Sequence, residues 1–204
     1  MARIVVFNSV TIDGVMQAPG HPDEDRRDGF EHGGWGQQHA ESVFAVIADR
    51  IARPGPLLLG RRTYEKFASV WPHMPDDNPY TSVINNCRKY VASTTLREPL
   101  EWNNSTLLTG DLATAVAKLK EQENLDITVL GSGELIQSLM RDSLVDEYVL
   151  LIHPLVLGSG RHHFPAGSPT TAFELVESVT TTTGVIIATY RPAVASATDE
   201  RSAR

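Results

Sequence analysis

The stretch Leu57-Leu58-Leu59-Gly60-Arg61-Arg62-Thr63-Tyr64-Glu65 joins a short apolar run to a glycine and two arginines. A buried strand that ends in glycine and leads into a helix makes a phosphate site, because the first N–H groups of the helix point at an anion and the helix dipole favours negative charge there. Gly60 would let the backbone approach the anion, and Thr63 would cap the helix. The alternative is a surface arginine pair after a core strand, and this stretch alone favours neither interpretation.

The neighbouring Arg61 and Arg62 indicate that more than one phosphate is bound. In dinucleotide sites, an arginine near the ribose accommodates the 2′-phosphate of NADP, whereas an acidic residue favours NAD. The pair therefore predicts a preference for NADPH over NADH.

A second turn, Leu130-Gly131-Ser132-Gly133-Glu134-Leu135, has the same order of apolar strand, small residues and helix start. Its glycines permit close backbone approach, and Ser132 can donate a hydrogen bond to an oxygen. Taken alone, an ordinary strand-to-helix turn is the simpler interpretation. Turns that follow parallel strands lie at one edge of the sheet, so the two turns together predict a single extended ligand.

Two weaker candidates follow other strands. Ser93 and Thr94 come after the apolar residues Val91-Ala92, and their hydroxyls suit a phosphate or a ribose, although a plain Ser/Thr turn is the simpler interpretation. Asp13 lies before Gly14 after the first apolar run, which is also a common turn pair. As a functional residue, Asp13 would contact a polar heterocycle or support proton delivery.

The hydrophobic pattern predicts strands that alternate with helices through the first two-thirds of the chain, followed by successive strands. This order predicts an α/β fold: a mixed, mostly parallel sheet flanked by helices, with a C-terminal antiparallel hairpin. Residues 1–192 are expected to form one domain, with a long loop over 9–36 and a disordered tail over 193–204. The expected strands are 4–7, 57–59, 90–93, 106–108, 127–130, 147–154, 173–182 and 185–190, and the expected helices include 38–51, 63–70, 112–123 and one after 133.

Composition excludes several classes of protein. With 18 Lys and Arg against 25 Asp and Glu, the chain lacks the basic balance of a general nucleic-acid binder. Cys87 is the only cysteine, so neither an intrachain disulfide nor a cysteine-based zinc site can form, and no metal site is expected. The adjacent His162 and His163 are expected on the surface or the rim rather than as metal ligands. The apolar runs are too short for a membrane span or a signal peptide, so a cytoplasmic protein is expected.

Together these segments resemble the dihydrofolate-reductase-like fold, and within it the riboflavin-biosynthesis reductase C-terminal-domain family. The resemblance covers residues 3–191 and rests on the order and spacing of short motifs. They are Ser9-Val10-Thr11-Ile12-Asp13-Gly14-Val15, Gly33-Gly34-Trp35, Leu58 to Glu65 with Trp71-Pro72, Tyr90 to Ser93, Leu130 to Leu135, and Asp146-Glu147 leading to His153 through Gly158 and to Gly160. The zinc motif of the deaminase that is often fused to such domains is absent, so a stand-alone reductase domain is expected.

The resemblance implies an NADPH-dependent reductase that transfers a hydride to a small heterocyclic (pterin- or pyrimidine-like) or carbonyl substrate. It places Gly60, Arg61, Arg62 and Thr63 on the adenosine phosphates, Ser93 and Thr94 at the 2′-phosphate and adenine, Gly131, Ser132, Gly133, Glu134 and Leu135 on the pyrophosphate, and Thr11, Gly14 and Val15 near the nicotinamide. Asp13 would steer the proton.

The resemblance also favours a homodimer, whose interface the apolar residues 148–157 would supply unless they are core. Two alternatives stay open: a non-catalytic NADPH-binding protein of the same fold, and an interaction module whose glycine turns are only turns.

Overall fold

The computed structural model describes residues 1–51, 55–75, 77 and 80–193. The predicted tail therefore lies outside the described residues, apart from Ala193. The helices are α1 (Ala40–Ile51), α2 (Arg61–Val70), α3 (Thr81–Asn86), α4 (Leu112–Gln122) and α5 (Gly133–Arg141), with short 3-10 turns at Arg27–Gly29, Gln37–His39 and Trp71–His73. The strands are β1 (Ile4–Thr11), β2 (Leu57–Gly60), β3 (Lys89–Ala92), β4 (Ser105–Leu108), β5 (Ile127–Leu130), β6 (Glu147–His153), β7 (Phe173–Thr180) and β8 (Ile186–Pro192).

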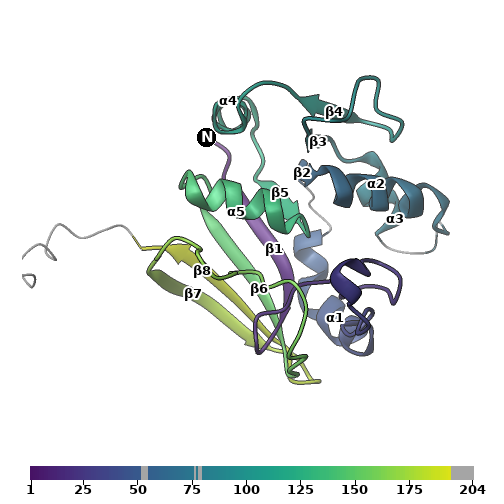
Figure 1. The fold of residues 1–204 in the computed structure, drawn as a ribbon, viewed down its shortest axis with the longest axis vertical. Helices are drawn as coiled ribbons and strands as arrows, with labels where there is room; N and C mark the ends of the chain where they lie inside the picture. The colour runs from purple at the N-terminus through teal and green to yellow at the C-terminus, as the bar shows by residue number, and fades with distance from the viewer. Residues whose placement is uncertain (52–54, 76, 78–79, 194–204) are drawn as a thin grey trace, which may run out of the picture.

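The described strands form one sheet in the order β4-β3-β2-β5-β1-β6-β8-β7 (Figure 1). Strands β1 to β6 run parallel to one another, whereas β8 is antiparallel to β6 and β7. The prediction of a mostly parallel sheet with a C-terminal antiparallel hairpin is confirmed. The carboxyl ends of six strands consequently meet at one edge, where open α/β sheets bind their ligands.

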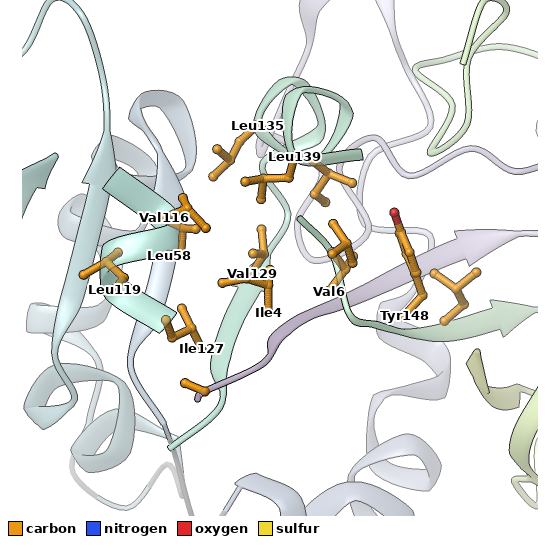
Figure 2. Packing of buried hydrophobic residues seen from close by; sticks show 14 of the residues in the cluster. Ile4, Val6, Leu58, Val116, Leu119, Ile127, Val129, Leu135, Leu139 and Tyr148 are labelled. Atoms are coloured by element: carbon orange, nitrogen blue, oxygen red, sulfur yellow. The ribbon is translucent and has the colours of Figure 1, made fainter. Parts of the chain in front are cut away.

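Alternation along the buried strands divides the core between the two faces of the sheet. On one face, side chains such as Ile4, Val6 and Leu58 pack against Val116 of α4 and Leu139 of α5 (Figure 2). The intervening side chains contribute to separate clusters with other helices. One cluster packs against Val43 and Ile47 of α1 and contains Val5, Val149, Leu151, Val185 and Ile187. The other packs against Tyr64 of α2 and contains Leu57, Leu59, Val91 and Trp102.

Two predicted boundaries at the carboxyl edge were wrong. The first strand continues to Thr11 instead of ending at residue 7, because its polar second half pairs with β6 as far as Thr11 and His153. The helix after β2 begins at Arg61 instead of at Thr63. Residues 8–11, predicted to lie outside the strand, therefore belong to β1, and Arg61 and Arg62 belong to the first turn of α2.

Candidate functional site

A cleft of about 1200 Å³ opens at the carboxyl edge of the sheet. The residues that follow β2, β3 and β5 line it, together with 16–19 and 24–27 from the first long loop and 161–162 from the segment after β6. The predicted residues Gly60, Arg61, Arg62, Thr63, Ser93, Thr94, Gly131, Ser132, Gly133, Glu134 and Leu135 all line this cleft. The structure thus brings three separate sequence segments together.

The two glycine turns are joined directly by hydrogen bonds. The backbone N–H of Gly60 donates to Ser132 Oγ at 3.0 Å, and the backbone N–H of Ser132 donates to Thr63 Oγ1 at 3.1 Å. Thr63 therefore does not cap α2 as expected: it lies inside the first turn, Gly60 holds the N-cap position, and the Thr63 hydroxyl contacts the other turn instead. This pairing fixes the start of α2 relative to the start of α5.

Neither of these helices has a side-chain cap at its N-terminus. By contrast, Asp111 caps α4 and accepts a hydrogen bond from the Thr114 N–H at 2.9 Å. An uncapped helix leaves its first N–H groups without intrahelical partners and carries partial positive charge there. Two such termini at one cleft can bind the oxygens of an anion, as predicted for a phosphate group.

Glycine is required at Gly131 more than at Gly60. Gly131 has φ +56° and the following Ser132 has φ +51°, so both residues adopt the left-handed conformation before α5 begins. At Gly60, φ is −75°, and an added Cβ would meet its neighbours at an ordinary 3.7 Å. At Gly60 the structure therefore shows no close contact that needs glycine. At Gly131 the left-handed backbone favours glycine, and an added Cβ would lie only 3.3 Å from the Thr63 side chain.

The two arginines of the first turn differ in their partners. Arg61 donates to both carboxylate oxygens of Glu65, at 3.0 and 3.2 Å. Arg62 is exposed and makes no hydrogen bond or ion pair with any residue that the structure describes. Arg62 is thus a cationic group at the cleft whose side chain has no counter-charge among the described residues.

The turn after β3 is organised by its own serine. Ser93 Oγ accepts hydrogen bonds from the N–H groups of Thr95 and Leu96, at 3.1 and 3.0 Å. Thr94 is exposed and lines the cleft. The Ser/Thr turn that was the simpler interpretation is present, and it still presents both hydroxyl residues to the cleft.

Four predicted residues do not line the cleft: Thr11, Asp13, Gly14 and Val15. The Asp13 carboxylate accepts hydrogen bonds from the N–H groups of Leu157 and Gly158, at 3.2 and 2.8 Å, and from the Thr11 hydroxyl. These bonds, with that of Thr11 first, hold the pKa of Asp13 below its ordinary value. The Asp13 carboxylate thus connects the turn after β1 to residues 157–158. This position does not support a role in proton transfer.

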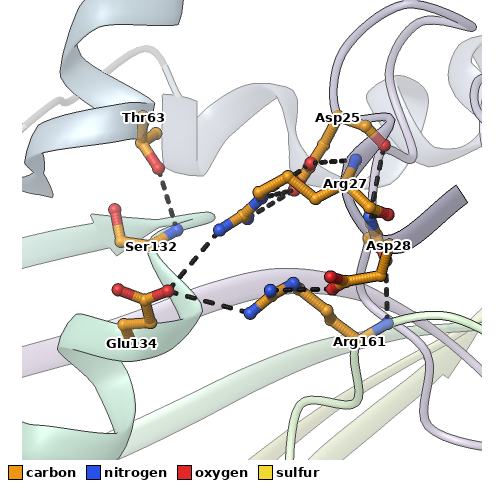
Figure 3. Close-up of polar contacts among 8 residues, drawn as sticks. Asp25, Arg27, Asp28, Thr63, Ser132, Glu134 and Arg161 are labelled. Atoms are coloured by element: carbon orange, nitrogen blue, oxygen red, sulfur yellow. Dashed lines mark hydrogen bonds and ion pairs between the residues drawn. The ribbon is translucent and has the colours of Figure 1, made fainter. Parts of the chain in front are cut away.

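Charged side chains that line the cleft, among them Asp25, Arg27, Glu134 and Arg161, form a network of ion pairs (Figure 3). The Glu134 carboxylate, at the start of α5, lies 3.5 Å from Arg27 and 3.7 Å from Arg161. Arg27 also pairs with Asp25, and Arg161 pairs with Asp28 at 2.8 Å. Burial opposes ionisation of Asp25, but the hydrogen bonds and charge of Arg27 lower its pKa overall. The network thus links the first long loop and residue 161 to the helix that bears the second turn.

Several residues at this site were not predicted from the sequence: Asn8, Gln17, Glu24, Arg27 and Arg161. Gln17 is buried; its amide nitrogen donates to the Arg27 carbonyl at 3.1 Å, and its amide oxygen accepts from the Arg161 N–H at 2.9 Å. Glu24 lines the cleft, and burial raises its pKa. For Gln17, Glu24 and Arg27, the available signal was the dense charge and polarity of the long loop over 9–36.

The paired histidines have different environments. His162 is exposed and lines the cleft, as expected for a rim residue. His163 is 2% exposed, so its placement on the surface was wrong. The described residues contain no group of three or more His, Cys, Asp or Glu side chains placed to hold a metal ion. Among the described helices, none has the length and hydropathy needed to cross a membrane.

Comparisons with known proteins agree with this architecture. Residues 2–187 match the family model of the RibD C-terminal domain. Two proteins of Bacillus subtilis (strain 168) are similar in sequence: the uncharacterized protein YyaP is 26% identical over 92% of this chain and 94% of its own, and the uncharacterized protein YwjB is 25% identical over 78% and 80%.

Two solved structures share the fold. A putative riboflavin biosynthesis protein from Shewanella sp. PV-4 aligns with a TM-score of 0.66 at 22% identity, over 95% of this chain and all of the other. A pyrimidine reductase-like protein from Corynebacterium diphtheriae aligns with a TM-score of 0.61 at 13% identity, over 95% of this chain and 92% of the other.

Proposed function

The chain belongs to the RibD C-terminal domain family, and from this premise we propose that it is an NADPH-dependent reductase. Its substrate would be a small heterocycle, pterin-like or pyrimidine-like, or a carbonyl compound that accepts a hydride. A cytoplasmic location is part of the proposal. The similar structures, named a riboflavin biosynthesis protein and a pyrimidine reductase-like protein, support the choice of reaction class.

One observation carries the cofactor assignment: two uncapped helix N-termini are joined to each other at one cleft. Such termini suit the two phosphates of a dinucleotide, since each offers backbone N–H groups and partial positive charge. Arg62 lies beside them, and its side chain is paired with none of the described residues. It suits a third phosphate, which NADPH has and NADH lacks.

The residues present fit a bound NADPH. The turns Gly60–Thr63 and Gly131–Leu135 would hold its pyrophosphate and adenosine phosphates, and Ser93 and Thr94 would contact the 2′-phosphate and the adenine. When bound, NADPH supplies the hydride, while the protein provides binding, orientation and electrostatics. Thr11, Gly14 and Val15 would act on the nicotinamide only through the backbone they support, because they do not line the cleft.

The cleft has room for a second ligand. Its volume of about 1200 Å³ exceeds the roughly 300–1,000 Å³ typical of a pocket for one small molecule. The part nearest the first long loop, around Met16, Gln17 and Glu24, would take the substrate. Glu24 is better suited than Asp13 to hold a proton there, because its pKa is raised and that of Asp13 is lowered.

Calorimetric titration of the purified protein with NADPH and with NADH tests the cofactor assignment. Tight binding of NADPH and weak binding of NADH is the expected result, and binding of neither would refute it. NADPH oxidation is then followed with a panel of ribosylaminopyrimidines, dihydropterins and dicarbonyls. Turnover with one class identifies the substrate type.

The position of Asp13 favours a second candidate, a protein that binds NADPH without catalysing a reaction. The carboxylate predicted to steer the proton is instead bonded to the backbone of residues 157 and 158. NADPH binding without oxidation across the whole substrate panel would favour this candidate.

We also propose that the protein forms a homodimer through the face of β6, β8 and β7. An apolar groove of about 250 Å³ lies on this face, lined by Tyr148, Leu150, Ile152, Phe164, Phe173 and Tyr190. Exposed apolar residues such as Leu175 and Ile186 extend it, and patches of this kind mark interaction surfaces. Analytical ultracentrifugation should give a dimer for the native chain and a monomer for Leu175→Glu.

A further inference from the structure

The amide of Asn8 continues the pairing of β1 with β5 beyond the last backbone pair. The ladder ends at Phe7 and Leu130. At the next position, Asn8 Oδ1 accepts a hydrogen bond from the Gly131 N–H at 2.7 Å, and Asn8 Nδ2 donates to the Gly131 carbonyl at 3.2 Å. One side-chain amide therefore takes both polar groups of a left-handed glycine.

These contacts define the orientation of the amide. A backbone N–H can only donate, so the atom of Asn8 that faces it must be the oxygen, and the atom on the other side must be the NH₂ group. That NH₂ group also lies 3.4 Å from His163 Nδ1. The Nδ1 atom must therefore accept, which places the hydrogen of the neutral ring on Nε2.

The surroundings of His163 favour a neutral ring. Burial lowers its pKa to about 4, and its backbone N–H donates to the Gly14 carbonyl at 2.8 Å. The ring packs edge-on against Phe164, with centroids 4.5 Å apart, and against Tyr148 at 6.1 Å. Its Nε2 atom has no hydrogen-bond partner among the described residues. Among the described residues, the contact between Asn8 Nδ2 and Nδ1 is therefore the only side-chain hydrogen bond of the His163 ring.

We infer that Asn8 and His163 are positioning residues for the second glycine turn: neutral His163, as an acceptor at Nδ1, orients the Asn8 amide, which in turn holds Gly131 and Ser132 in the conformation that opens the N-terminus of α5. The inference deepens the proposed function and rests on it, because this turn is a predicted pyrophosphate site. Asn8 lines the cleft, whereas His163 acts through Asn8.

The tautomer can be tested without any ligand. Long-range ¹H–¹⁵N correlation spectra of the ¹⁵N-histidine-labelled protein at pH 7 report which ring nitrogen carries the hydrogen. We expect an unprotonated Nδ1 and a protonated Nε2 for His163. A hydrogen on Nδ1 would overturn the inference, since Nδ1–H cannot accept from Asn8.

Two variants then test the positioning role. His163→Asn keeps an acceptor, because its amide oxygen is as many bonds from Cα as Nδ1 is, whereas His163→Leu removes it. Loss of one neutral hydrogen bond should weaken NADPH binding roughly 3- to 10-fold in His163→Leu, and His163→Asn should restore it to within about twofold. His153→Leu is the matched control, because His153 is equally buried, at 2% exposure, and does not line the cleft.

Equal weakening in all three variants would refute the positioning role and indicate general destabilisation. If the native protein binds no dinucleotide, the proposed function fails, but the positioning role of Asn8 and His163 can still be tested without a ligand. In that case, the amide chemical shift of Gly131 should move in His163→Leu and return in His163→Asn. An unmoved shift in both would overturn the inference.

Discussion

The backbone N–H of Gly60 donates to the hydroxyl oxygen of Ser132 across a gap of 72 residues, at 3.0 Å. This bond holds the two uncapped helix starts together. Replacing Ser132 with alanine leaves the Gly60 N–H without its acceptor, so we expect Ser132→Ala to lower the free energy of unfolding by about 1 kcal/mol and to weaken NADPH binding several-fold. Urea denaturation and calorimetry measure the two effects. The control is Ser69→Ala, because the Ser69 hydroxyl donates to the Lys66 carbonyl within the same helix. Equal losses in both variants would contradict the role of Ser132.

The different partners of Arg61 and Arg62 predict different effects on cofactor choice. Arg62→Ala should reduce affinity for NADPH roughly tenfold or more and leave NADH affinity nearly unchanged, because Arg62 has no counter-charge among the described residues. Arg61→Ala should have the smaller effect, since Arg61 is paired with Glu65. Parallel titrations with both nucleotides check this, with Arg97→Ala as a control outside the cleft. Equal weakening of NADPH and NADH would rule out a 2′-phosphate contact.

The bonds of Asp13 predict a structural effect of its substitution. Asp13→Asn removes a charge that accepts from two backbone N–H groups and a hydroxyl, so we expect a loss of about 1–2 kcal/mol in stability with NADPH affinity unchanged. Thermal unfolding and calorimetry report these quantities, and the exposed Asp142→Asn serves as the control. Reduced turnover at unchanged stability would instead restore Asp13 to the chemistry.

The ion pairs of Glu134 predict a change in loop mobility. Glu134→Gln removes the shared partner of Arg27 and Arg161, so backbone amides in 20–29 should exchange hydrogen several-fold faster. Global stability should fall by less than about 1 kcal/mol, because Glu134 is largely exposed. Hydrogen exchange followed by mass spectrometry measures the loop, with Glu121→Gln on α4 for comparison. Added salt should mimic the variant in the native protein; unchanged exchange in both would argue against the network.

The two buried histidines predict how stability depends on pH. Burial lowers the pKa of His163 from 6.5 to about 4, and burial together with nearby His39 does the same for His153. The unfolded chain therefore binds protons between pH 6.5 and 4 that the folded chain does not, so stability is full above this window and falls as the pH drops through it. From pH 7 to pH 5 we expect a loss of up to about 2 kcal/mol for each histidine.

Urea denaturation across this range measures the loss, and His153→Leu should remove about half of it. A flat profile between pH 7 and pH 5 would show that these rings are not buried in neutral form.

The strand–turn–helix segments could be predicted because their information is local. Apolar runs such as 57–59 and 127–130 end at glycines, and this pattern specifies both the strand and the edge where its turn lies. Nine of the predicted cleft residues lie in these two glycine turns, and Ser93 and Thr94 follow a third apolar run. The mixed sheet followed from the order in which such runs alternate with helical patterns.

The partners of individual side chains could not be predicted in the same way. Thr63 looked like a helix cap, yet its hydroxyl bonds to a residue 69 positions away. Asp13 looked available for chemistry, but it bonds to the backbone 144 positions away. No periodicity encodes such contacts, because they depend on how separate loops meet after the sheet has formed. The same reason explains why Arg27, in a short 3-10 turn, and Arg161, on an irregular segment, were missed.

The central place of β1 has a consequence for synthesis of the protein. This strand leaves the ribosome before its partners: Ile127, which pairs with Ile4, is translated 123 residues later, and the residues of β6 follow later still. The apolar run 4–7 therefore lacks its native partners while residues 8–126 are made, and such long-range parallel pairing is intrinsically slow. We expect nascent chains that stop before β6 to need a chaperone to avoid aggregation. We also expect the native sheet to form only after β6 has emerged from the ribosome.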